Sequence, residues 1–450
     1  MKRGEYFLIP ALVCLAVFWR APFVWFRTDD FAWLGLRLEV HGAGSLMRAL
    51  FLPEAQGTVR VLSERLFFLV FSSVFGLHAA PFRWFALATW FVALALAGAV
   101  GARITGSRAA GIAAAVVWTT SFGVAVPLMW SSAYNQILCS FLLLAALYAR
   151  TRFLESGETR WRVAEWVAYL AGFGALEVTV MYPLAALLYT RCVARQKDRG
   201  AWALLAPAVI FGGIHWLAIA RPAGETYRVV VDGRIAGTAL VYLKNALGPD
   251  GFPVRWAIGA ALASFLVWRV WRRDARALFP AAWFALFIAP VLPLPNHILY
   301  YELTTPLIGM AWLSGWALEW AWKAGAVARA LAIGLAAAFA AGSLPQINAD
   351  TAEWLARTSR MRLMVRAAQA AAAERSLEQS RGTALIFKGV DQELFDTGFE
   401  DEPFRLFGVT RVYLAPGSEN LRGSERFRIS ADDAARLIEN GQARMVEVTH

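Results

Sequence analysis

Runs of roughly 20 apolar residues, separated by short connectors that contain Lys or Arg, recur along the first three quarters of the chain. An α-helix needs a run of this length to cross a bilayer, and 58% of all residues are hydrophobic while 17% are charged. The pattern predicts an all-α membrane domain with about eleven transmembrane helices, and it excludes a disordered chain. The single spans are expected at about residues 6–26, 82–102, 109–127, 134–149, 201–219, 255–268, 277–292, 303–321 and 330–345.

The distribution of charge indicates which connectors face the cytoplasm. The whole chain has a net charge of +11, but residues 346–450 carry 14 Lys and Arg against 16 Asp and Glu, so the preceding part carries +13. Most of those cations lie in alternate connectors, which is the positive-inside pattern of membrane proteins and not the stripe of a nucleic-acid-binding surface. We therefore expect a cytoplasmic N-terminus, an extracytoplasmic C-terminal region and no nucleic-acid partner.

Residues 163–190 form a long apolar stretch with clusters of Arg at both ends. A single helix through this stretch would place one cluster outside, against the positive-inside pattern. Two short helices that turn near Glu177 would keep both clusters on the cytoplasmic side. We favour this hairpin, because broken helices often form binding sites at membrane depth.

This topology puts two long loops and the C-terminal region on the outer face. The membrane domain covers residues 1–345, and its outer loops are 27–80 and 220–254. Apolar residues at helical spacing in the first loop predict helices that lie on the membrane surface. Residues 346–450 are expected to form a small periplasmic α/β domain with a three-stranded sheet. Its predicted elements are a helix at Asp350–Arg375, strands at Thr383–Lys388, Arg411–Leu414 and Met445–Val448, and a helix from a Ser430 cap to Asn440.

Three carboxylates are candidates for catalysis. Asp29 and Asp30 open the first outer loop, where they can take a proton from an acceptor hydroxyl or hold a divalent cation such as Mg or Mn. The structural alternative is a solvated loop start, with Asp29 capping a helix over 31–38. Glu177 lies among apolar residues, where an unpaired charge is costly. It is either a site residue that faces the same cavity as Asp29 and Asp30, or a protonated side chain that is hydrogen-bonded between helices.

Cations in the outer loops are candidates for binding a phosphate or an anionic lipid headgroup. Each of them alone is more often a surface contact, but together they lie on one face of the membrane. No zinc motif, phosphate-binding Gly-rich loop, dinucleotide fingerprint or Ser–His–Asp order is present. The candidate cations are Arg60, Arg65, Arg221, Arg228, Arg234 and His297.

The order of these features resembles the glycosyltransferases of the GT-C fold, in particular the protein O-mannosyltransferase branch and its bacterial relatives. The match runs over most of residues 1–345 and rests on short motifs. In that family the first outer loop starts with an acidic pair, as at Asp29–Asp30. The other similar segments are Arg60–Leu62, Phe75–Leu77, Leu176–Glu177 with Pro183, and Tyr300–Leu303 with Pro306 and Gly309. The chain departs from the pattern at Leu176, Tyr300 and Arg83, where the family has Lys, Arg and His.

The resemblance implies an integral-membrane enzyme that moves a hexose or pentose from a polyprenyl-phosphate carrier to a hydroxyl of a glycan or protein acceptor on the outer face. It implies that Asp29 or Asp30 is the base. It also implies that Tyr301, together with Arg60 and His297, helps to bind the phosphate of the lipid carrier. The alternative is a catalytically inactive scaffold, or a protein that binds lipid-linked glycans. The 39 Arg against 5 Lys are typical of a GC-rich bacterial source, so we expect the bacterial inner membrane.

Overall fold

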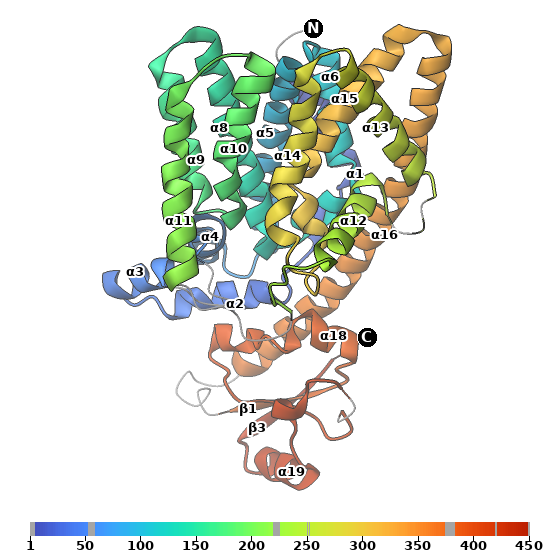
Figure 1. Cartoon of the computed structure of the whole chain (residues 1–450). Helices are drawn as coiled ribbons and strands as arrows, with labels where there is room; N and C mark the ends of the chain where they lie inside the picture. The colour runs from blue at the N-terminus through green and yellow to red at the C-terminus, as the bar shows by residue number, and fades with distance from the viewer. Residues whose placement is uncertain are drawn as a thin grey trace.

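The computed structural model describes residues 5–52, 59–218, 226–249, 251, 253–373, 383–418 and 421–448. A helical bundle forms the larger part, short helices lie across one end of it, and a small α/β domain projects beyond them (Figure 1). The bundle contains α1 (Glu5–Val17), α5 (Ala79–Thr105), α6 (Arg108–Thr119), α8 (Tyr134–Ser156), α9 (Thr159–Gly172), α10 (Tyr182–Leu188), α11 (Leu205–Ala218), α12 (Arg234–Leu247), α13 (Arg255–Trp271), α14 (Leu278–Ile288), α15 (Leu307–Ala324) and the first part of α16 (Ala326–Ala373).

Four helical segments of the described chain are long and apolar enough to cross a membrane. A bent pair, Arg108–Thr119 with Phe122–Met129, makes a fifth if it is counted as one span. The chain is therefore a helical membrane protein, and the count of about eleven crossings stays a prediction. The four segments are Ala79–Thr105, Ser131–Ser156, Arg199–Leu217 and Ala326–Ala373.

Small residues let the central helices approach closely. A Cβ added at Gly111 of α6 would collide with the backbone oxygen of Gly98 in α5, and one added at Gly315 of α15 would collide with that of Ala110. Such contacts between backbones are typical of helix packing in membranes. The indole of Trp312 fixes the same interface, because its Nε1 donates a hydrogen bond of 2.9 Å to the backbone oxygen of Ala97.

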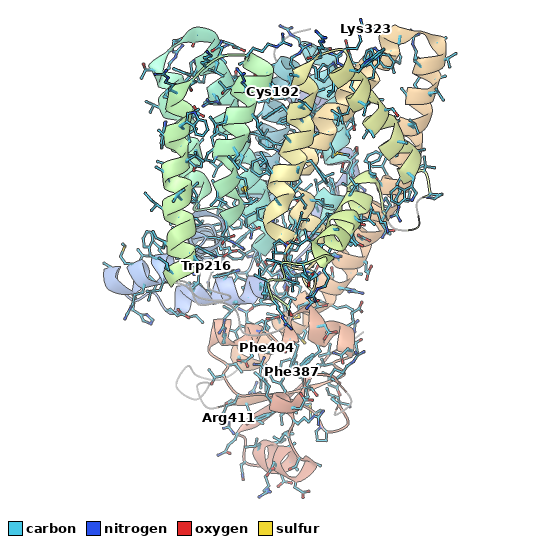
Figure 2. All side chains as sticks on the ribbon, viewed as in Figure 1. Cys192, Trp216, Lys323, Phe387, Phe404 and Arg411 are labelled. Atoms are coloured by element: carbon cyan, nitrogen blue, oxygen red, sulfur yellow. The ribbon has the colours of Figure 1, made fainter. Side chains whose placement is uncertain are left out.

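The chain turns back after α9, as the hairpin prediction requires. Glu177 begins the return segment, η7 (Glu177–Met181), which continues into α10 and η8 (Tyr189–Ala194). Arg162 at the start of α9 and Asp198 after η8 lie 2.9 Å apart, so both Arg clusters are at the same end of the bundle. The hairpin is therefore confirmed. Cys192 of η8 and Lys323 of α15 mark that end, opposite the α/β domain (Figure 2).

Short helices of the first loop lie across the other end of the bundle (Figure 1). α3 exposes Leu46, Met47 and Phe51, as expected of a helix at a membrane surface. The expected cap was wrong: α2 begins at Asp29 itself, Thr28 stands at the N-cap, and no side-chain hydrogen bond caps the helix. The helices of this layer are α2 (Asp29–Gly35), η2 (Leu36–Leu38), α3 (Ala43–Phe51), η4 (Val61–Leu66) and α4 (Phe67–Phe75).

The α/β domain has the predicted three-stranded sheet. All its strands are parallel, in the order β2-β1-β3, and β3 begins two residues before the predicted strand. The Ser430 hydroxyl accepts a hydrogen bond from the Asp433 backbone N–H at 3.1 Å, so the predicted cap is present. α16 runs without a break across the predicted domain boundary at 345/346. The elements are β1 (Ala384–Lys388), α18 (Gln392–Leu394), η13 (Phe395–Phe399), η14 (Pro403–Phe407), β2 (Val412–Leu414), η15 (Glu425–Phe427), α19 (Ala431–Glu439) and β3 (Ala443–Glu447).

The α/β domain packs directly on α2. The Thr28 backbone N–H donates a hydrogen bond of 2.9 Å to the Thr397 oxygen, and a Cβ at Gly398 would overlap the ring of Phe31. The Arg37 guanidinium reaches the Leu406 backbone oxygen at 3.4 Å. The start of the first outer loop is therefore enclosed between the bundle and this domain.

Candidate functional site

Asp30 is fully buried and its two oxygens are engaged by the protein. One oxygen accepts hydrogen bonds from the Ser132 backbone N–H at 2.7 Å and from the Ser132 hydroxyl at 2.6 Å. The other accepts from the Arg27 backbone N–H at 3.1 Å and lies 3.9 Å from the buried guanidinium of Arg83. These bonds connect the start of the 27–80 loop to the bundle. A substrate hydroxyl cannot reach the Asp30 carboxylate without displacing these partners.

Asp29 differs from its neighbour because its side chain is exposed. Partial burial raises its pKa, while the charge of Arg27 opposes the rise. The Arg27 guanidinium is held 4.0 Å from the ring centre of Trp354 and 5.6 Å from that of Trp130, so its position is fixed. Asp401 of the α/β domain faces this corner: burial, then repulsion from Asp29, raises the pKa of Asp401 to about 6.

Arg60 and Glu177, predicted separately from distant parts of the sequence, form one ion pair. Nε of Arg60 lies 3.0 and 3.1 Å from the two Glu177 oxygens, and Nη2 donates to Glu177 at 3.0 Å. Nη1 donates to Glu64 at 2.7 Å, and Glu64 also accepts from Asn135 at 3.2 Å. Glu177 is therefore paired with a cation and is not an isolated glutamate between helices. When all three are ionised, Arg60, Glu64 and Glu177 carry a net charge of −1.

Tyr301 lies within electrostatic range of both Asp29 and Arg60. It belongs to η12 (Tyr300–Leu303), and it is near enough to Glu302, Arg60 and Asp29 for their charges to act on its phenol. Burial raises the pKa of the neighbouring Glu302 to about 7. Tyr242 donates a hydrogen bond to Glu302, and the His297 imidazole lies 3.8 Å from it. Residues from distant segments of the chain thus lie near one another at the end of the bundle next to the α/β domain.

The other predicted cations occupy different positions. Arg65 is fully buried, donates to the Ala49 backbone oxygen at 2.6 Å and lies 5.3 Å from the Trp33 ring, so it holds α3 in place and does not face the site. The Arg234 guanidinium is exposed and pairs with Asp232 at 2.9 Å. Arg228 is also exposed, beside Tyr227, whose ring centre is 4.4 Å from that of His297. Arg221 lies outside the described residues.

Four side chains of this region were not predicted from the sequence: Glu64, His215, Glu302 and Asp401. Glu64 follows Arg60 by four residues, a spacing that predicts an ion pair on a helix. Glu302 stands in the segment that resembles the family, next to Tyr301. His215 of α11 lies within electrostatic range of Glu177, and no described residue bonds to its Nδ1. Nothing in the sequence indicates that Asp401 faces Asp29.

The acidic pair does not fit a divalent cation. A cation bound by both carboxylates needs free oxygens on each, but those of Asp30 already accept hydrogen bonds from Ser132 and Arg27. Among the described residues, no group of three or more His, Cys, Asp or Glu side chains is arranged to hold a metal ion. We therefore derive no catalytic step through a metal.

The comparisons with known proteins bear on the fold. No protein-family model matches the chain, and no curated protein does. The apo crystal structure of the Archaeoglobus fulgidus oligosaccharyltransferase aligns with a TM-score of 0.54 and 10% identity, over 91% of this chain and 64% of that one. ArnT from Cupriavidus metallidurans, bound to undecaprenyl phosphate, aligns with a TM-score of 0.49 and 13% identity, over 99% and 93%.

The likeness to the archaeal enzyme confirms the GT-C fold that the sequence resemblance implies. This chain spans less than two thirds of the length of that enzyme, and at such identity the likeness establishes the fold alone. The protein O-mannosyltransferase-like branch stays a prediction.

Proposed function

We propose that this protein is a membrane glycosyltransferase that moves a sugar from a polyprenyl-phosphate carrier to an acceptor hydroxyl on the outer face. The observation that carries the proposal is the meeting of Asp29, the Arg60–Glu177 pair and Tyr301 at one end of a GT-C bundle. An exposed carboxylate and an oriented guanidinium are what acid–base catalysis and phosphate recognition require.

Asp29 acts as the base in this proposal, and Asp30 positions it. The acceptor hydroxyl gives its proton to the exposed Asp29 carboxylate while its oxygen attacks the anomeric carbon. The bond from that carbon to the phosphate oxygen breaks, and the polyprenyl phosphate leaves with the electron pair. The raised pKa of Asp29 makes it a stronger base than an ordinary surface carboxylate.

Arg60 binds the phosphate in this proposal, held in orientation by Glu177 and Glu64. A guanidinium has five N–H donors, and the bonds to the two glutamates use three of them, leaving one on each terminal nitrogen for a phosphate oxygen. Because the trio is net negative, a carrier phosphate needs further positive charge. The exposed Arg228 supplies it in this proposal; it follows Tyr227 in the chain, and the Tyr227 ring lies against His297.

The arrangement in the membrane follows from the same proposal. The protein lies in the bacterial inner membrane, with a cytoplasmic N-terminus and the α/β domain in the periplasm. Its partners are the lipid carrier and a glycan or protein acceptor. The GT-C domain and the α/β domain meet along α16, near residue 345.

The second candidate is a scaffold that binds the lipid-linked glycan without transferring it. The observation in its favour is that Glu64 and Glu177 neutralise Arg60, the cation expected to face the leaving phosphate. A scaffold of this kind would bind the carrier and leave the sugar attached to it.

The test uses the purified full chain in lipid nanodiscs with a panel of polyprenyl-phosphate sugars, measuring both carrier binding and release of the sugar. We expect Asp29→Asn to reduce release by about 10²–10⁴-fold with binding retained. The matched control, Asp432→Asn, removes an exposed carboxylate on α19 and should change neither quantity. Binding without release by the unmodified protein would establish the scaffold, and full activity of Asp29→Asn would refute Asp29 as the base.

A further inference from the structure

The α/β domain contains a cavity at its end farthest from the bundle. It has a volume of about 500 Å³ and lies among β2, the Arg428–Ser430 segment and α19. Arg411, which is labelled in Figure 2, lines this cavity, and Figure 1 places α19 at the far tip of the molecule. The cavity is separate from the Asp29–Arg60 site, and no step proposed above uses it.

The charge of this cavity is opposite to that of its domain. Residues 346–450 have a net charge of −2, yet the cavity lining includes Arg411, Arg428 and Arg436 against the single acid Asp433, a net of +2. Three cations around a concavity raise the local concentration of anions. Arg436 pairs with Asp433 at 2.8 Å and Arg428 lies 3.7 Å from Glu425, so acidic neighbours offset part of this positive charge.

The uncharged lining narrows the class of ligand. Tyr413 offers a ring and a hydroxyl, and Asn440 and Gln442 offer amides that donate and accept hydrogen bonds. Hydroxyl-rich sugar units use such groups, and the flanking arginines suit carboxylate or phosphate substituents. A free phosphate would contact only the cations and leave most of a cavity of this volume empty.

We propose that this cavity binds an acidic oligosaccharide, whose acid groups contact Arg411, Arg428 and Arg436 and whose sugar ring lies against Tyr413. The proposal is independent of sugar transfer, because it concerns binding at the far end of the α/β domain. An acidic peptide has the same kind of charge, but it lacks both the sugar ring that would lie against Tyr413 and the hydroxyls that would bond to the amides.

The test measures equilibrium binding to the full chain in nanodiscs. The probes are an oligogalacturonate, a phosphorylated mannose oligomer, a neutral malto-oligosaccharide of equal length, an oligoglutamate peptide and inorganic phosphate. We expect at least one acidic saccharide to bind more than tenfold tighter than the neutral sugar, the peptide or phosphate. No binding of either acidic saccharide would overturn the proposal, as would equal binding of the peptide, which would indicate recognition of charge alone.

Substitutions test whether the acidic saccharide binds in this cavity. Arg411→Gln with Arg436→Gln should weaken the acidic saccharide about tenfold, since each exposed charge contact contributes modestly. The matched control, Arg362→Gln with Arg366→Gln, removes the same charge from exposed positions of α16 outside the cavity. Equal weakening by both pairs would refute the site. Arg411→Lys with Arg436→Lys keeps the charge and should retain part of the binding, which separates a loss of contacts from a loss of folding.

Discussion

Replacing Glu302 by Gln should remove a large part of the pH dependence of this protein's stability. Glu302 is nearly buried, its side chain being 10% exposed, and burial raises its pKa from 4.5 to about 7. Tyr242 donates a hydrogen bond to it and thereby favours the ionised form, but this only partly offsets the burial. The folded protein therefore holds a proton here that the unfolded chain releases at lower pH.

The sign and size of the effect follow from proton linkage. Because the folded state binds the proton more tightly, its stability falls as the pH rises from the unfolded pKa to the folded one. For a pKa that rises from 4.5 to about 7, the loss between about pH 5 and pH 8 is about 2–3 kcal/mol. Gln cannot ionise and has nearly the same shape, so the variant should lack this component.

Thermal unfolding in detergent at several pH values measures the difference. The apparent melting temperature of the unmodified protein should fall about 2–3 °C more than that of Glu302→Gln over this range. Tyr242→Phe removes the bond that favours ionisation, so it should move the transition to higher pH. Glu447→Gln is the control, because Glu447 is 70% exposed in a surface pair with Lys388. Parallel curves for Glu302→Gln and the unmodified protein would refute the reasoning.

Two further predictions concern the bundle, and thermal unfolding in detergent measures both. Gly111→Ala should destabilise it by about 1–3 kcal/mol because the added methyl group collides with Gly98, whereas Gly212→Ala in α11, with open space around it, should not. Arg150→Gln should cost about 3–5 kcal/mol because Glu165, 2.8 Å away and fully buried, loses its cation and keeps only the hydrogen bond from Tyr182. Arg152→Gln, which breaks a half-exposed surface pair, should cost about 0–1 kcal/mol. Unchanged melting of Gly111→Ala or Arg150→Gln would contradict the packing described here.

The hairpin and the sheet could be predicted because their causes are local. The Arg clusters around 163–190 constrain the topology through the positive-inside pattern. The Arg162–Asp198 pair shows that both ends of this stretch lie at the same end of the bundle, as expected. The strand at 384–388 is a short apolar run bounded by Gly382 and Gly389. The Ser430 cap could be predicted because its hydroxyl acceptor and the backbone donor at Asp433 are only three residues apart in the sequence.

The difference between Asp29 and Asp30 could not be predicted from adjacent positions. Consecutive side chains on a helix point about 100° apart, so one of the two faces the protein. Which one is buried depends on Ser132, which is 102 residues away in the sequence. The same holds for Asp401, which the α/β domain brings to Asp29. The ion pair of Arg60 with Glu64 could have been predicted from the sequence, since the two residues are four positions apart.

The continuity of α16 has a mechanical consequence. Its 48 residues give a rod about 70 Å long, more than twice the thickness of the hydrocarbon core. The membrane part of this helix continues without an intervening loop into the part that carries the α/β domain, with Pro345 inside the helix where the two parts join. Transmembrane helices tilt to match the thickness of the bilayer, and a tilt of about 10° would swing a protruding arm of about 40 Å by about 7 Å. Membrane thickness therefore affects the angle at which this protein presents its α/β domain.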